Sequence, residues 1–508
     1  MSGQSAGLSR RRFTIVGGSV LFTLGAAPLV LGRTASGQST RVRRAIHRLV
    51  RPDGSHDPDL ARYVAALKAL QENHRLLWEQ LRNFHDQFCS GAGAREVHFN
   101  WAFVPWHRAY LVTYERILRE VSKQDSVAIP YWDWFASNAF PPVFRTGPLN
   151  HTARRIPGRP INNADRGLGP AGERSNYQVF AAFGRGNFLG TPQSFFGADA
   201  PGGNRRSAGL PESGGHSGMH NYVGGDMADL NRAARDPCFY SHHANVDRMM
   251  ELWKRNIRGS NSSWRAESGP WLNTTFTFRF DNKRVYAYRV RDLLDTETVA
   301  DADGVRLAYT YDNIGAPGAV ASSVPAPSVL SLDGAVVQAG GLSFEPPKQI
   351  ISLGPLRVTP ETSRTSAVTL STPAQGALKE FLNRDRSKEL QNFTADTAAG
   401  GGARIGASVV LRLEKIQIPP HNFQINFFLN EKNPSISDID TSNNYIASFN
   451  HVPSHANTIE LDVLEVDVSE RLRDRIAELG SVQISTVTEY LPPGSAPVVI
   501  GNISFVIR

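Results

Sequence analysis

Residues 236–248 read Asp-Pro-Cys-Phe-Tyr-Ser-His-His-Ala-Asn-Val-Asp-Arg, and residues 97–108 read Val-His-Phe-Asn-Trp-Ala-Phe-Val-Pro-Trp-His-Arg. In the first stretch, Asp236 is a typical helix N-cap, and the proline that follows it suits the first turn of a helix. In the second stretch, Pro105 marks the start of another helix for the same reason. Both stretches therefore predict helices that contain or directly follow histidines. The other helices that pack beside these two define the fold of this region.

Two further helices are predicted from apolar periodicity and histidine spacing. From Asp59 to Cys89, apolar residues recur at steps of three and four, which is the pattern of one buried helix face. A shorter helix is expected over 216–222. The stretch from Phe135 to Gly215 is rich in Gly, Pro, Asn and Arg, which indicates long surface loops. The first half of the chain is therefore predicted to be mainly α, a four-helix bundle with long loops.

Eight of the fourteen histidines fall between His85 and His243, and this grouping indicates a metal site. Neutral imidazole binds copper, zinc, iron and nickel. His216 and His220 are spaced i,i+4, so a helix would direct both at one ion. Two sets of three histidines, drawn from four helices around one cavity, would form a paired metal site within a bundle.

His98 and Asp247 are expected to occupy special positions around this site. His98 lies nine residues before His107, and nine steps of a continuous helix would place them on opposite faces. His98 is therefore expected on the loop that precedes the helix. Asp247 lies one turn after His243, and carboxylates often orient metal-binding imidazoles from outside the ligand sphere. Asp247 is therefore predicted to support the metal site without binding the metal.

The second half of the chain has the pattern of short strands. Thr275–Phe280 and Val285–Val290 alternate and favour β-structure, and a stretch rich in Pro, Ala, Ser and Gly from Ile314 to about Gln375 resembles a linker. Strand-like runs at regular spacing then predict a β-sandwich. These runs are Val409–Leu413, Phe423–Phe428, Tyr445–Phe449, Ile459–Val466, Val482–Thr486 and Val498–Ile507.

The N-terminus has the features of an export signal. A basic segment at 9–13 precedes an apolar run from Ile15 to about Leu31, and small residues follow at 35–37. The paired arginines before Phe13 resemble the twin-arginine signal, which exports folded proteins to the periplasm or beyond. An uncleaved membrane anchor is the alternative, although the run is short and broken by glycines. We expect no stable membrane insertion.

Charge and cysteine content exclude two classes of protein. The net charge is +8, but residues 1–37 hold four arginines and no acidic residue, which leaves +4 for the rest of the chain. That is weak for a nucleic-acid-binding protein, so no nucleic-acid partner is expected. Two cysteines, Cys89 and Cys238, are no evidence of a disulfide framework. Cys238 is expected in the core.

The two opening stretches resemble the copper A signature (97–108) and the copper B signature (236–248) of tyrosinases and plant polyphenol oxidases. Residues 288–295, Tyr-Arg-Val-Arg-Asp-Leu-Leu-Asp, look like the segment that follows the catalytic domain in plant enzymes. Residues 447–453, Ala-Ser-Phe-Asn-His-Val-Pro, look like part of the plant-type C-terminal shielding domain. The chain is identified as a member of this type 3 dicopper family, a bacterial one with plant-type C-terminal organisation.

The resemblance implies two copper ions, each held by three histidines, and oxidation of phenols and o-diphenols to o-quinones by O2. The second histidine of the 242–243 pair is the ligand in the family, so His242 is read as a neighbour. His74 and His151 match no motif position and are expected to be structural. The implied ligands are His85, His98 and His107 for copper A, and His216, His220 and His243 for copper B.

The resemblance also implies roles for residues around the copper ions. A cysteine at the position of Cys89 forms a thioether bond with the second copper A histidine, here His98; a buried free thiol is the alternative. Glu212 corresponds to a glutamate that holds a water able to help deprotonate a phenol, although glutamates are usually exposed. Ser217 and Asn221, each after a copper B histidine, are expected to tune that water.

Leu230 stands where the plant enzymes usually have phenylalanine over the copper. Leucine is smaller and more movable, so the entrance is expected to be wider. The signal at 1–37 is followed by the dicopper domain (38–273), a short-strand extension and linker (274–375) and an all-β shielding domain (376–508). The expected activity includes ortho-hydroxylation of monophenols. A catechol oxidase without that step, and a haemocyanin-like O2-binding protein, are the alternatives.

Overall fold

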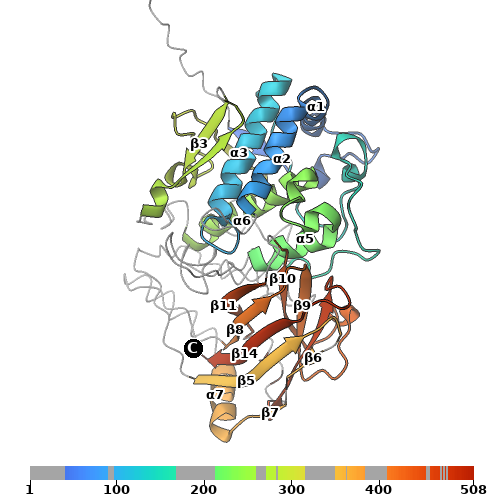
Figure 1. Ribbon diagram of the computed structural model, residues 1–508, viewed down its shortest axis with the longest axis vertical. Helices are drawn as coiled ribbons and strands as arrows, with labels where there is room; N and C mark the ends of the chain where they lie inside the picture. The colour runs from blue at the N-terminus through green and yellow to red at the C-terminus, as the bar shows by residue number, and fades with distance from the viewer. Residues whose placement is uncertain are drawn as a thin grey trace, which may run out of the picture. The chain divides into compact units, whose positions relative to one another are not determined.

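The computed structural model describes residues 40–89, 97–167, 212–258, 270–281, 284–314, 349–383 except 362 and 366, 409–453, 458–468, 472, 475 and 479–507. Buried apolar side chains form one large cluster among the helices and a second among the C-terminal strands. The chain is therefore a helical region followed by a β-region, as the sequence predicts (Figure 1).

The helical region begins with α1 (Pro58–Asn73) and α2 (Arg75–Cys89). Asp57 caps α1 by accepting from the backbone N–H of Asp59, and Pro58 occupies the first turn. Apolar periodicity predicts one continuous helix here, but the backbone leaves helical geometry at His74, with φ −131° and ψ 43°. Neither glycine nor proline marks this position, so nothing in the pattern signals the break.

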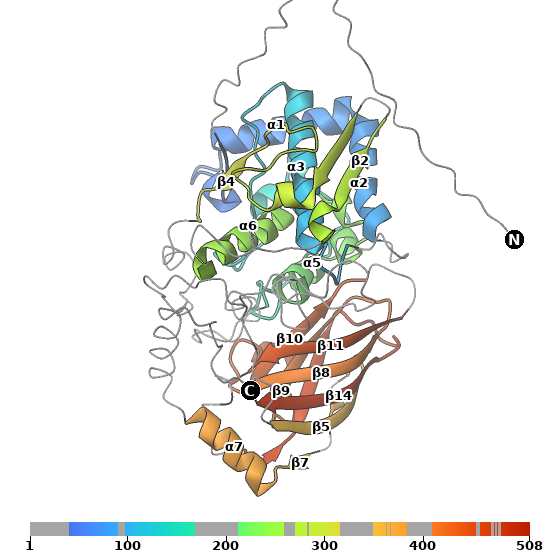
Figure 2. The ribbon, with the colours of Figure 1, turned by 90° about the vertical axis from the view of Figure 1, so that its left-hand side faces the viewer.

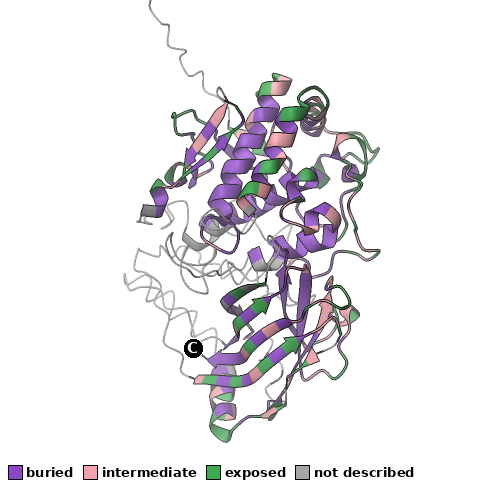
Figure 3. Ribbon diagram, viewed as in Figure 1, coloured by how far each residue is buried: buried purple, intermediate pink, exposed green. Residues whose placement is uncertain are grey.

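Three more helices complete the copper-site framework: α3 (Phe103–Ser122), α5 (Ser217–Val223) and α6 (Cys238–Arg258). The N-terminal half of α3 is buried on every side, which makes it the central helix of this region (Figure 3). Lys123 ends α3 in the left-handed conformation. Within the described residues, none of the helices combines the length and the hydropathy needed to cross a bilayer.

Two small sheets flank the helices. The predicted strands are present as the antiparallel pair β2 (Thr275–Arg279) and β3 (Val285–Arg289). The pattern of the sequence did not indicate a second, parallel pair, β1 (Arg41–Arg43) with β4 (Tyr309–Tyr311). The two strands lie more than 260 residues apart in the sequence, and each is too short to produce a recognisable alternation.

The C-terminal region contains two four-stranded antiparallel sheets whose inner faces share one apolar cluster. The order of the first sheet is β11-β8-β14-β5, and Figure 2 shows these strands side by side. The order of the second is β10-β9-β13-β6. The bounds are β5 (Gln349–Val358), β6 (Ser363–Arg364), β8 (Val409–Ile418), β9 (Phe423–Leu429), β10 (Tyr445–His451), β11 (Ile459–Asp467), β13 (Ile484–Glu489) and β14 (Val498–Ile507).

The β-region starts earlier than residue 376, the boundary that composition suggests. β5 pairs with β14 along its length and buries alternate residues, among them Leu353, Leu356 and Val358. A pair of short strands, β7 (Val368–Thr369) with β12 (Ser481–Val482), and helix α7 (Thr372–Leu382) follow it. The Pro-, Ala-, Ser- and Gly-rich composition of this part of the chain conceals the alternation of β5, so the sequence from Ile314 to about Gln375 reads as a linker.

Candidate metal centre

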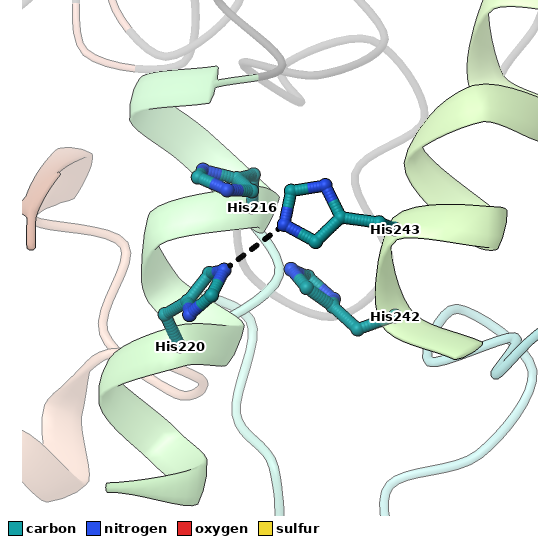
Figure 4. A group of neighbouring side chains, drawn as sticks. All are labelled: His216, His220, His242 and His243. Atoms are coloured by element: carbon teal, nitrogen blue, oxygen red, sulfur yellow. Dashed lines mark hydrogen bonds between the residues drawn. The ribbon is translucent and has the colours of Figure 1, made fainter. Parts of the chain in front are cut away.

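Seven buried histidines form two neighbouring groups between the helices. The nitrogen atoms offered by His85, His98 and His107 lie within 4.8 Å of one another. The same holds for a second group, His216, His220, His242 and His243 (Figure 4). The two groups face each other, because the rings of His107 and His243 stack with centroids 4.3 Å apart and an interplanar angle of 11°.

Each group draws its histidines from separate elements. His85 is on α2, His98 on the turn before α3, and His107 on α3. His216 ends a π-helical turn, η5 (Glu212–His216), that leads directly into α5 with His220. His242 and His243 lie on α6. The arrangement is the predicted one, including the loop position of His98, and a π-turn at such a position is common near functional sites.

Backbone carbonyls orient three of these rings. The Nδ1 atoms of His85, His107 and His220 each lie 2.6 Å from a carbonyl oxygen, those of Leu230, Phe103 and Met227 respectively. Each Nδ1 must therefore carry the proton and donate it to the carbonyl. The Nε2 atom of each ring is then left with a lone pair, which is the form that binds a metal.

The remaining nitrogens are placed as metal ligands would be. Nε2 of His85 is 3.3 Å from Nε2 of His107, and Nε2 of His220 is 3.3 Å from Nε2 of His243. In the first pair both nitrogens hold lone pairs, so no hydrogen bond forms between them, and a cation between them removes the repulsion. Imidazole nitrogens bound tetrahedrally at about 2.0 Å from an ion lie about 3.3 Å apart. The residues therefore fit one metal ion in each group.

Burial keeps five of these imidazoles neutral, those of His85, His107, His216, His220 and His243. Desolvation, followed by the neighbouring histidines, holds the pKa of His85, His107, His216 and His243 well below its usual value. Burial lowers the pKa of His220 to about 3. A protonated imidazole cannot bind a metal, so the site is ready for loading at neutral pH without first losing protons.

The stability of the copper-free protein is expected to fall as the pH drops from 7.5 to 5.5. Histidines have a pKa of about 6.5 in the unfolded chain, so below that pH the unfolded chain binds more protons than the folded one. The stabilisation is therefore complete above about pH 6.5 and is lost on acidification. The melting temperature of the copper-free protein at pH 7.5, 6.5 and 5.5 measures this loss of stability. A melting temperature independent of pH over this window would contradict the burial of neutral imidazoles.

Glu212, Ser217 and Asn221 lie beside the second group, all at most 3% exposed. The Oε1 atom of Glu212 accepts from the backbone N–H of Phe99 at 2.7 Å. This hydrogen bond joins the loop that contains His98 to the η5 turn that leads into α5. Phe99 has φ 59°, a conformation uncommon for an aromatic residue. The hydroxyl of Ser217 donates to the carbonyl of Glu212 at 2.8 Å. Glu212 is buried at the site, not on the surface.

A close backbone approach explains the glycine between His216 and His220. A Cβ atom at Gly218 would lie 2.1 Å from the carbonyl oxygen of Asp165, so any larger residue would push α5 away from this loop. This close contact fixes the distance between the loop that contains Asp165 and the segment that holds His216 and His220.

Leu230 is 1% exposed and acts on the site through its backbone. Its carbonyl is the oxygen that orients His85, and Met227, three residues earlier, supplies the carbonyl that orients His220. One short segment between α5 and α6 thus holds a ligand of each group. This role has no signature in the sequence, because every residue type offers the same carbonyl group.

Asp247 lies in a buried charge network that links the two motif helices. Its carboxylate accepts from Arg108 at 2.5 Å and from Arg43 at 3.3 Å. It also accepts from the hydroxyls of Tyr309 and Tyr311. Burial alone would raise the pKa of Asp247, but Arg108 and Arg43 outweigh it and hold the pKa below its usual value. Arg108 directly follows His107, so this ion pair fixes α3 against α6 and acts on the histidines through their helices.

The remaining predicted positions are as follows. The side chain of Cys89 lies outside the described residues, so its thioether bond stays a prediction. Cys238 is a buried free cysteine. His151 is paired with Asp226 at 2.9 Å, outside both histidine groups. His242 was expected to be a neighbour of the site, and the structure places one of its ring nitrogens within the second group itself.

The comparisons with known proteins agree with this geometry. The family model for the common central domain of tyrosinase matches residues 75–194 and 186–256. The latent form of polyphenol oxidase from Prunus armeniaca is 27% identical over 469 residues, covering 86% of this chain and 71% of that protein. Catechol oxidase B from Solanum tuberosum is 32% identical, covering 47% of this chain and 45% of that protein. The chain thus spans about half the length of some relatives and more of others.

Solved structures resemble the fold over nearly the whole chain. Latent apple tyrosinase has a TM-score of 0.58 at 20% identity, covering 93% of this chain and 98% of its own. A latent aurone synthase, which is a polyphenol oxidase, has a TM-score of 0.61 at 20% identity, and the match covers 92% of this chain and 90% of its own. The fold likeness thus extends through the C-terminal strands. Together these matches show that residues 75–194 and 186–256 match the common central domain of tyrosinase, and that the fold, C-terminal strands included, is like that of latent polyphenol oxidases.

Proposed function

We propose that this protein oxidises phenols and o-diphenols to o-quinones with O2. The observation that carries the proposal is the pair of facing histidine groups, each buried and oriented for one metal ion. Two copper ions, when bound there, supply the redox chemistry and the binding of O2. The side chains of this protein hold the ions in place, exclude water and manage the proton of the substrate.

Copper content and oxygen uptake test this proposal together. Copper-loaded protein is expected to hold two copper ions per chain and to consume O2 with a catechol, releasing an o-quinone. The same assay with the corresponding monophenol separates a tyrosinase from a catechol oxidase, which would oxidise the catechol alone. Two copper ions with no quinone from either substrate would favour an O2-binding protein and would defeat the proposal.

Glu212 supports the proposed hydroxylation of monophenols. A phenol with a pKa of about 10 is almost wholly protonated at neutral pH, so a nearby base helps it to bind as the phenolate. Glu212 is a buried carboxylate that begins the η5 turn, four residues before His216. Ser217 and Asn221 adjoin the copper B histidines, where they can tune a water held by this carboxylate. A catechol is more acidic and depends less on such a base.

Glu212→Gln is therefore expected to lower monophenol turnover by about 10²-fold or more, the usual size of a general-base effect. Catechol turnover should change far less, because its oxidation does not need that step. Steady-state rates with a matched monophenol and catechol measure the ratio. Glu72→Gln, which alters an exposed glutamate on α1, is the control. Equal losses with both substrates would remove Glu212 from the hydroxylating step.

The C-terminal domain is proposed to shield the copper site. Residues 450–453, at the end of β10, contact residues on both sides of the copper site. Asn221 donates to the carbonyls of Phe423 and His451, at 3.0 and 3.2 Å. The backbone N–H of Leu230 donates to the carbonyl of Pro453 at 3.2 Å. Val452 belongs to the apolar cluster of the helical region.

Further contacts reach the copper A side and the edge of the interface. The ring of His451 stacks on Phe99, the residue after His98, with centroids 5.5 Å apart. Arg159 pairs with Asp165 and, across the interface, with Glu489 at 2.8 Å. A domain held at these points would limit the access of substrate. The alternative is that it only stabilises the helical region by burying apolar area.

Residues 1–37 and Cys89 carry two further proposals, export by a twin-arginine-type signal of a bacterial protein and a thioether bond to His98. Residues 1–37 and the side chain of Cys89 are not among the parts of the chain that the structure describes, so both proposals rest on the sequence. Formation of the thioether joins sulfur to a ring carbon and passes two hydrogens to O2.

Peptide mass analysis of the exported, copper-loaded protein is expected to show both features. The mature N-terminus should begin near residue 38, and one linked fragment should contain Cys89 and His98 with two hydrogen atoms fewer than the separate peptides. Cys238, a free thiol, is the internal control, because it should be alkylated after denaturation. Complete alkylation of Cys89 would show that the bond is absent, and an intact residue 1–37 segment would contradict processing.

A further inference from the structure

We propose that His242 is a reserve copper ligand, able to hold the copper B ion when His243 cannot. The inference rests on the proposed dicopper function and concerns how securely the second ion is bound. The copper B group contains four imidazoles, whereas the copper A group contains three. The described residues thus offer copper B one more nitrogen than the three that an open catalytic site uses.

The position of His242 is that of a ligand. It is fully buried, and one of its nitrogens lies within 4.8 Å of the nitrogens offered by the other three histidines. Its ring stacks on that of His216, with ring centroids 5.5 Å apart. It meets the rings of His220 and His243 edge-to-face, with centroid distances of 4.9 and 5.2 Å. Figure 4 shows a nitrogen of His242 directed toward the space between His220 and His243.

The surroundings of His242 do not suit a structural histidine. The carbonyl of His216 can accept from only one of the two ring nitrogens of His242, and the other nitrogen has no hydrogen-bond partner among the described residues, whereas His151 is paired with Asp226. A buried polar atom without a partner destabilises the fold, so a purely structural position would favour an apolar residue or one whose polar atoms are all hydrogen-bonded.

Helix geometry explains why His242 is a reserve and not a regular ligand. Consecutive residues on a helix point about 100° apart, so His242 and His243 on α6 cannot both approach one ion in the same way. His243 stacks on His107 of the copper A group, which places it between the two groups of histidines. Loss of the His243 ring opens the space into which the nitrogen of His242 is directed.

Copper content per chain, measured after loading and removal of loosely bound metal, tests the proposal. The wild type is expected to hold two ions, and His107→Ala one, because copper A has no fourth imidazole in the described group. His243→Ala is expected to keep two ions. The double variant His243→Ala/His242→Phe is expected to drop to one, a twofold loss relative to His243→Ala. His242→Phe alone is expected to hold two.

Folding is checked by thermal melts of the copper-free proteins, and His243→Gln, which better preserves side-chain volume, replaces His243→Ala if that variant does not fold. A folded His243 variant that holds one ion would overturn the proposal. So would a double variant that still holds two. A wild type that binds fewer than two ions would instead defeat the proposed dicopper function, and this inference with it.

Discussion

Replacing His107 or His243 by alanine is expected to reduce catechol oxidation below about one-hundredth of the wild-type rate, since changes merely around metal ligands already cost about 10–100-fold. The proposed oxidation transfers two electrons, and each group of histidines would hold one of the two ions that supply this redox chemistry. His107 and His243 stack on each other between the groups, so removing either ring also disturbs the geometry that joins the two ions. Oxygen uptake with a catechol measures the loss.

The two variants are expected to differ in metal content but not in their loss of activity. A copper ion held by His242 in place of His243 would sit displaced from the position that His107 faces, so the two-ion geometry is lost even though the metal is retained. His151→Ala is the control, because His151 pairs with Asp226 outside both groups, and its activity should stay within about twofold of wild type. Full activity in His243→Ala would refute the ligand assignment.

Cleavage between residues 315 and 348 is expected to raise catechol turnover about tenfold or more. This size of effect is expected if the C-terminal domain covers the copper site at least about nine-tenths of the time, because only the uncovered molecules can then bind substrate. This segment joins the end of the helical region to β5, so one cut there separates the chain into the two structural regions. Docking of the C-terminal domain then becomes a bimolecular equilibrium, which dilution shifts toward release. A specific protease site introduced in this segment allows a single cut.

Cut and uncut protein are compared at several dilutions, with Glu489→Ala as a second way to weaken the interface by removing the partner of Arg159. Shielding predicts that turnover rises with dilution only after cleavage, and that the product quinone inactivates the enzyme faster. Unchanged turnover in a cut protein whose domains have separated would show that the domain is structural. Unfolding of the helical region on release would lead to the same conclusion.

Several elements of the fold could be predicted because their residues carry a local pattern. The Asp-Pro start of α6, Pro105 in α3 and the alternating strands from Val409 onward follow from side-chain periodicity and capping. The break at His74 and the early start of the β-region at Gln349 did not follow, because the first has no breaker residue and the second is hidden in a Pro- and Ser-rich stretch. Pairing of β1 with β4 depends on contacts across the whole chain.

The sequence by itself determined a paired, histidine-rich metal site, since metal coordination requires particular side chains and the grouping of the histidines supplies them. The resemblance of residues 97–108 and 236–248 to the copper signatures then implied copper as the metal. Only the tertiary structure decided which groups surround the histidines. The carbonyls that orient His85 and His220 belong to the backbone, which has no residue signature. The bond from Asn221 to the carbonyl of Phe423 joins residues 202 positions apart. The nitrogen that His242 offers to copper B likewise depends on how α5 and α6 pack, because spacing fixes directions along one helix but not between two.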